Sequence, residues 1–108
     1  MNVQKLIEIL LELRSASREV SANPSEDALR KLVNKYGMYF SGENYNCIFS
    51  HYLAHSINTV FAIHIDIDEL NKMIPATCSS LNMKYEPMTE VSNISKPNPP
   101  TTCYKIIL

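Results

Sequence analysis

The chain has few of the residues on which several common kinds of site depend. It contains three cysteines, Cys47, Cys78 and Cys103, and no C-x-x-C pair. A disulfide framework is therefore not expected, and the pattern predicts reduced, buried thiols in a cytoplasmic protein. The two glycines, Gly37 and Gly42, stand at predicted turns, and no glycine-rich phosphate-binding motif is present.

Neither the charge nor the hydropathy of the chain favours binding to a nucleic acid or a membrane. The 108 residues include 10 basic and 11 acidic side chains, spread evenly along the chain, for a net charge of −1. Proteins that bind phosphates or anionic lipids present a basic surface, which this composition does not provide. No apolar run approaches the ~20 residues of a membrane span. The run Leu6–Leu13 contains Glu8 and Glu12, so no signal peptide is expected.

The first part of the chain predicts two helices joined by a short link. In residues 2–21, apolar side chains recur at steps of three and four, which is the spacing of one face of a helix. Residues 25–36 form the second helix, with Pro24 at its start and Gly37 placed to end it. The sequence therefore predicts an N-terminal αα-hairpin.

The apolar stripe of the first helix can be buried in two ways. It can pack against the rest of its own chain, or against a second copy in a homodimer. About three heptads is near the minimum length for a coiled coil, so the pattern leaves both arrangements open. The residues that would form the dimer contact are Val3, Leu6, Leu10 and Leu13.

Residues 59–67 carry the clearest strand pattern, because apolar side chains at every second position alternate with small or polar ones. A second strand is predicted at 102–108 and is expected to pair with the first. Residues 88–101 contain several prolines and predict an extended connection. The predicted fold is one α+β domain, 1–108, in which the αα-hairpin and further helices pack on a small sheet centred on strand 59–67.

Residues 45–57 fit either a helix or a strand, and either element places Cys47, His51 and His55 on one face. Thiolate and imidazole are typical ligands of zinc or copper, so one alternative function is that of a metal-binding regulator. Eight residues of helix rise by about 12 Å, which makes His51 and His55 a better pair for one ion than all three residues together. The competing interpretation is a buried Cys47 with two surface histidines.

His64 and Asp66 alternate along the predicted strand 59–67, and Asp68 continues the alternation just past its end, followed by Glu69. Carboxylates beside an imidazole can act as acid and base or hold Mg²⁺, so a small enzyme is a second alternative. The competing interpretation is the solvent face of a strand that leads into the first turn of a helix.

Six aromatic residues, four of them tyrosines, gather within residues 36–52. Tyrosine is enriched at protein interfaces, although these residues can equally fill the core. Without a catalytic motif or an expected cofactor, the sequence predicts a small cytoplasmic module that binds another protein. A toxin-neutralising immunity protein or another small inhibitor is a concrete example. The candidate partner-binding residues are Tyr39, Tyr45, Tyr52, Asp66, Asp68 and Glu69.

Overall fold

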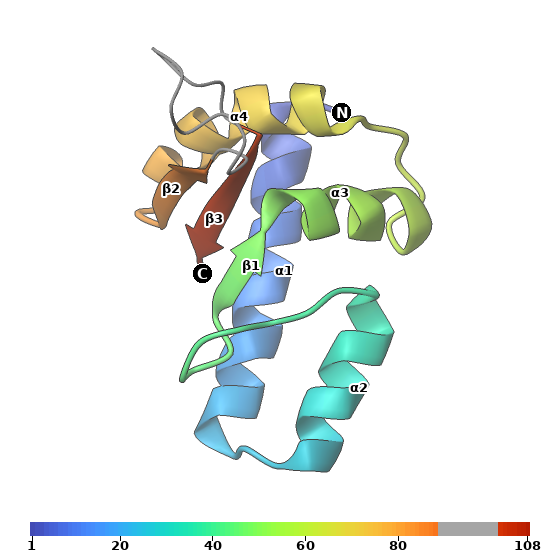
Figure 1. Cartoon of the computed structure of the whole chain (residues 1–108), viewed down its shortest axis with the longest axis vertical. Helices are drawn as coiled ribbons and strands as arrows, with labels where there is room; N and C mark the ends of the chain where they lie inside the picture. Colours follow the sequence, from blue (N-terminus) through green and yellow to red (C-terminus); the bar gives the residue numbers. More distant parts are fainter. Residues whose placement is uncertain (89–101) are drawn as a thin grey trace.

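The computed structural model describes residues 1–88 and 102–108, and within them it contains four helices and three strands. This is an α+β fold, as the sequence predicts (Figure 1). The elements in chain order are α1 (Val3–Ala22), α2 (Glu26–Tyr36), β1 (Cys47–Phe49), α3 (Ser50–Thr59), α4 (Ile67–Ser80), β2 (Lys84–Met88) and β3 (Cys103–Ile107).

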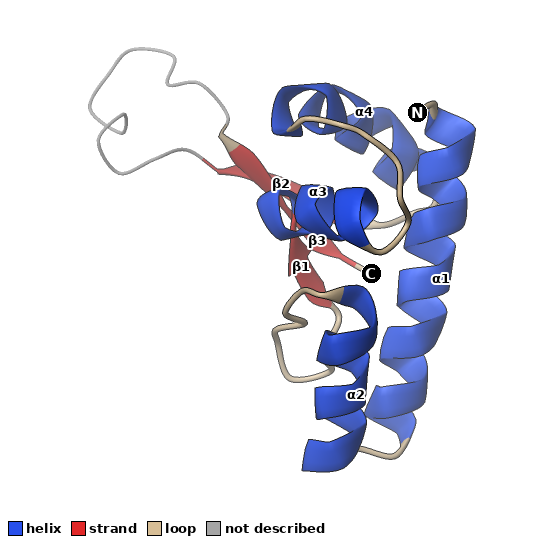
Figure 2. Ribbon diagram, turned by 90° about the vertical axis from the view of Figure 1, so that its right-hand side faces the viewer, coloured by secondary structure: helices blue, strands red, loops and turns tan. Residues whose placement is uncertain are grey.

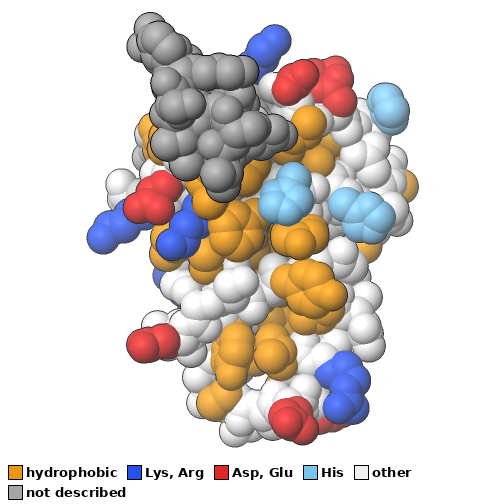
Figure 3. All heavy atoms as spheres, in the orientation of Figure 1, with side chains coloured by type: hydrophobic (Ala, Val, Ile, Leu, Met, Phe, Trp, Pro, Cys, Tyr) orange, Lys and Arg blue, Asp and Glu red, His pale blue; other side chains and the backbone are white. Residues whose placement is uncertain are grey.

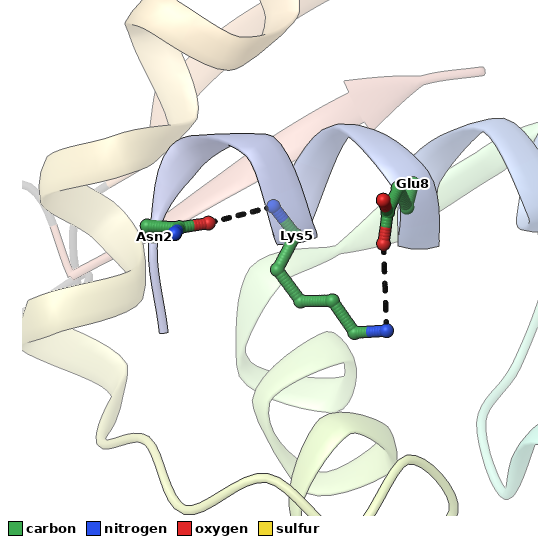
Figure 4. Close-up of polar contacts among 3 residues, drawn as sticks. All are labelled: Asn2, Lys5 and Glu8. Carbon is green, nitrogen blue, oxygen red and sulfur yellow. Dashed lines mark hydrogen bonds and ion pairs between the residues drawn. The ribbon is translucent and has the colours of Figure 1, made fainter.

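Helix α1 runs along most of the length of the molecule, and the other elements lie beside it (Figure 2). Its start is defined by Asn2, whose side-chain oxygen accepts a hydrogen bond of 2.9 Å from the backbone N–H of Lys5. Figure 4 shows this cap and the ion pair that follows it, in which Lys5 Nζ lies 3.4 Å from Glu8. Exposed ion pairs contribute little to stability, so the cap is the stronger signal for the helix start.

Helices α1 and α2 form the predicted αα-hairpin. The hydroxyl of Ser25 accepts a hydrogen bond of 3.0 Å from the backbone N–H of Ala28 and so caps the start of α2. Gly37 ends the helix with a φ of +61°, a conformation that glycine adopts without steric cost. In the views of Figures 1 and 2, α2 lies beside the C-terminal part of α1, and the sheet, α3 and α4 lie beside the rest.

The apolar stripe of α1 is buried inside its own chain. Leu6, Leu10 and Leu13 each have 0% of their surface exposed and belong to the hydrophobic core. Three of the four residues predicted to contact a second copy, Leu6, Leu10 and Leu13, therefore pack within the chain, and for these three the prediction of a homodimer contact is corrected. Val3, the fourth residue of that prediction, is half-buried.

The strands form an antiparallel sheet in the order β1-β3-β2, so that β3 is the central strand of the described residues. Strand β3 confirms the strand predicted at 102–108, but its neighbours are β1 and β2. Ile106 faces Ile48 on one side and Tyr85 on the other, and it is fully buried. The sheet therefore packs on the helices through the face that carries Ile106.

Residues 59–67 form no strand, so the prediction that the sheet is centred on them is wrong. Thr59 ends α3 and Ile67 begins α4, so residues 60–66 connect the two helices, and Ala62 interrupts the extended chain with a φ of +55°. The side-chain amide of Asn58 forms hydrogen bonds with both the N–H and the carbonyl of Ile65. Its Oδ1 accepts from the Ile65 N–H at 3.2 Å, and its Nδ2 donates to the Ile65 carbonyl at 2.7 Å. One side-chain amide thus replaces the neighbouring strand that these groups would otherwise need.

Residues 45–57 contain both of the elements that the sequence left open. Strand β1 is short, and α3 begins directly after it at Ser50. The buried Ser50 hydroxyl accepts a hydrogen bond of 2.8 Å from the Tyr104 N–H and donates one of 2.8 Å to Asn71 Oδ1. This single hydroxyl continues the pairing of β1 with β3 and connects both to α4.

Strand β2 contains a proline, Pro87, opposite Tyr104 of β3. Since the N–H of Tyr104 is directed to Ser50, the nitrogen of Pro87 points away from β3 as well. The missing N–H therefore removes no hydrogen bond between the two strands. The connection predicted for 88–101 begins one residue later, because Met88 ends β2, and residues 89–101 lie outside the described part of the chain.

Replacing Asn58 with alanine is expected to lower the free energy of unfolding by about 1–3 kcal/mol, because the N–H and carbonyl of Ile65 lose their partner. Urea unfolding followed by circular dichroism measures the change. Asn34→Ala, at an exposed position of α2, is the control. Equal losses in the two variants would contradict the role assigned to the Asn58 amide.

Candidate functional site

Four aromatic side chains lie in series across the surface between α2 and the sheet. The rings of Tyr39 and Tyr52 meet edge to face with centroids 5.7 Å apart, the His51 ring lies 4.1 Å from Tyr52, and Phe49 lies 6.1 Å from His51. Tyr39 is 63% exposed and Tyr52 is 37% exposed. We call these four residues the aromatic row.

The exposure of Tyr39 follows from its neighbours. Met38 and Phe40 are both buried in the core, so the extended segment between α2 and β1 directs the side chain between them outward. Tyr52 is placed in a similar way, because the next residue of α3, Leu53, is fully buried. Both tyrosines are thus held at the surface by apolar neighbours that anchor the backbone.

A hollow of about 420 Å³ adjoins Tyr39 on the outer side of α2. Leu29 and Val33 are among its apolar lining residues, and Glu26 and Arg30 are among its polar ones. Figure 3 shows hydrophobic side chains in orange extending over this face from α2 past α3 toward the sheet. We call the aromatic row together with Leu29 and Val33 the apolar surface.

Tyr45 is the one predicted interface tyrosine that does not join the aromatic row. Its backbone has a φ of +53°, and its side chain is half-buried against the core. Its carbonyl accepts a hydrogen bond of 2.8 Å from the hydroxyl of Ser17 on α1. Tyr45 therefore has a structural role in joining the segment before β1 to α1.

The acidic candidates lie at the start of α4. Asp66 caps the helix by accepting a hydrogen bond of 2.8 Å from the backbone N–H of Glu69, and this bond holds the pKa of Asp66 below its usual range. Asp68 and Glu69 occupy the first turn, where acidic groups favour the helix dipole. Asp68 lines a hollow with Asn71, Lys72 and Tyr104, and neither His64 nor Asp66 is part of that lining.

The structure does not bring Cys47, His51 and His55 onto one face. Cys47 is buried in β1, whereas His51 and His55 are exposed on α3. The chain changes from strand to helix between Cys47 and His51, so the four-residue spacing no longer keeps the thiol beside the imidazoles. Across residues 1–88 and 102–108, no group of three or more His, Cys, Asp or Glu side chains is placed to hold a metal. Cys47 therefore does not join the two histidines, and the predicted site of three ligands is not formed.

Cys78 and Cys103 are not activated nucleophiles. Burial raises the pKa of the Cys78 thiol to about 11 and also raises the pKa of Cys103. Because the thiolate is the reactive form, both shifts lower reactivity.

The sequence analysis counted Phe49 in the aromatic cluster but missed Leu29 and Val33 as parts of this surface. The available signal was the width of the apolar stripe on α2. Positions 28, 29, 32, 33 and 36 are all apolar, which is wider than one buried helix face requires. Leu32 and Tyr36 are buried, and Leu29 and Val33 line the hollow on the outer side.

Comparisons with protein-family models, with curated proteins and with solved structures gave no match. A search of the helices in residues 1–88 and 102–108 found none with the length and hydropathy of a membrane span.

Tyr36 should make the stability of the protein depend on pH in the alkaline range. Burial, followed by the nearby carboxylates of Glu12 and Glu19, raises its pKa from 10.0 to about 12. A raised pKa contributes stability that is present below pH 10 and is lost as the pH rises toward 12. Urea unfolding between these values should show a shallower decline for Tyr36→Phe than for the original chain. Tyr39→Phe, at an exposed tyrosine, should keep the steeper decline, and identical curves for both variants would contradict this assignment.

Proposed function

We propose that the protein is a binding module for another protein and that the apolar surface is where the partner docks. The observation that carries the proposal is the edge-to-face pair of Tyr39 and Tyr52, held at the surface beside the hollow of Leu29 and Val33. Tyrosines packed beside a hollow are typical of the residues that supply most of the binding energy at protein interfaces.

The packing of the aromatic row favours binding for a second reason. Each ring already rests on its neighbour, so the side chains lose little rotamer freedom when a partner covers them. Covering the exposed apolar area of Tyr39 contributes roughly 25 cal/mol per Å² removed from water. Preorganised aromatic contacts of this kind give affinity without a rearrangement of the backbone.

The charges around the apolar surface indicate what kind of contact the partner makes. The chain has a net charge of −1, and the hollow includes one acidic and one basic residue, Glu26 and Arg30. Long-range attraction is therefore weak, and the affinity should depend little on ionic strength. A nucleic acid would instead show the steep salt dependence of phosphate contacts.

A more specific form of the proposal is a small inhibitor, such as a toxin-neutralising immunity protein. Such a protein acts by covering a surface of its partner and needs no catalytic group of its own, which agrees with a surface built from aromatic and aliphatic side chains. Asp66, Asp68 and Glu69 lie at the start of α4, and none of them is among the residues that line the hollow beside Tyr39. The proposal therefore rests on the apolar surface and not on Asp66, Asp68 or Glu69.

Site-specific cross-linking tests whether this surface docks a partner. A photo-reactive phenylalanine analogue replaces Tyr39 in one variant, Tyr52 in a second and Val60 in a third, in the native cells. Val60 is the matched control, because it is 42% exposed and lies at the other end of α3 from Tyr52. Positions 39 and 52 should cross-link to the same polypeptide, and position 60 should not. Equal cross-linking from all three positions, or cross-links only to a second copy of the chain, would contradict the proposal.

The partner found in this way allows a quantitative test. The variant Tyr39→Ser/Tyr52→Ser should bind the partner about 30-fold or more weakly, which corresponds to the loss of ~2 kcal/mol expected of a binding hot spot. Val60→Ser should bind as the original chain does. Isothermal titration calorimetry measures the affinities, and an unchanged affinity for the double variant would show that the partner docks elsewhere.

A further inference from the structure

Two histidines, His51 and His55, are placed one helical turn apart on α3, and both are exposed. Residues four apart on a helix have Cβ atoms about 5–6 Å from each other, close enough for two imidazoles to reach one ion. Figure 3 shows histidine side chains in pale blue over α3, on the face that also carries the orange band. Exposed side chains change rotamer at little cost, so the imidazoles need not already converge.

Both imidazoles are available to a ligand. The ion pairs of the described residues involve neither, and the one hydrogen bond that reaches His55 comes from the Thr59 hydroxyl to the backbone carbonyl, at 2.8 Å. The contact of His51 with the Tyr52 ring involves the ring surface. A metal would therefore displace no polar interaction of these two side chains with the described residues.

We propose that His51 and His55 supply two ligands to a divalent first-row transition metal, with the remaining coordination positions filled by water. Imidazole suits Ni²⁺, Cu²⁺ and Zn²⁺, and the order of affinities places Cu²⁺ above the other two. A structural zinc site uses four protein ligands, so a site with two ligands is an exchangeable one at the surface. This inference concerns the metal alone and stands apart from the proposed protein-binding function.

The location of the site gives it an optical readout. The chain contains no tryptophan and six tyrosines, so its emission is tyrosine emission. The His51 ring lies 4.1 Å from Tyr52, which in turn contacts Tyr39. A bound ion that quenches fluorescence, such as Ni²⁺, should therefore lower the emission of these two tyrosines.

The test is equilibrium dialysis and fluorescence titration of the full chain with Ni²⁺, an ion that does not oxidise thiols. The original chain should bind one equivalent with partial quenching. His51→Ala and His55→Ala should each weaken binding by at least about tenfold, the smallest effect typical even of groups that only support a metal ligand. Alanine favours helices, so both variants should keep their helical circular dichroism.

Two control variants separate this site from other ligands of the chain. His64→Ala removes the third histidine, which is exposed but lies outside α3, and Cys103→Ser removes the partly exposed thiol. Both should bind Ni²⁺ as the original chain does. The proposal is overturned if the original chain binds no Ni²⁺. It is also overturned if binding survives in His51→Ala and His55→Ala, or if either control loses it.

Discussion

The backbone hydrogen bonds of β3 are divided between two neighbours, and much of the molecule depends on that division. Tyr104 donates its N–H to the Ser50 hydroxyl, and Leu108 donates its N–H to the Asn46 carbonyl, so both groups point toward β1. In an antiparallel sheet the direction alternates along the strand, so the backbone groups of Lys105 and Ile107 point toward β2. Because β1 leads directly into α3, the pairing with β3 also determines where that helix begins. The start of α3 in turn determines which way His51 and Tyr52 face.

The helices were predictable because their signals are local. The three-and-four spacing of α1 and the glycine that ends α2 need no knowledge of distant residues. Residues 59–67 show the limit of such signals. Their alternation of burial is real, since Ile65 is buried and His64 is exposed. A period of two identifies an extended chain, but a strand also needs a neighbouring strand. Here the side-chain amide of Asn58 takes the place of a neighbouring strand. No pattern in the sequence tells whether an extended segment will pair with a strand or with a side-chain amide.

The candidate site was predictable in part for the same reason. The aromatic cluster was visible in the sequence, and the exposure of Tyr39 follows from the alternation of Met38, Tyr39 and Phe40. The convergence of Cys47 with two histidines was not realised, because equal spacing preserves a common face only within one kind of element. The chain changes from strand to helix at Ser50. The outer side of α2 required tertiary structure, since only the position of α1 decides which half of its wide stripe is buried.

The orientation of Pro87 has a consequence for how molecules meet one another. A strand at the border of a sheet offers its free N–H and carbonyl groups to any extended chain, and this is a common start of aggregation. On the side of β2 away from β3, Pro87 has no N–H to offer, and its ring stands where a backbone hydrogen bond would form. At the opposite border, the backbone of Cys47 is already paired with Ser41. For the sheet of residues 1–88 and 102–108, growth from one molecule into the next is thus disfavoured at both borders.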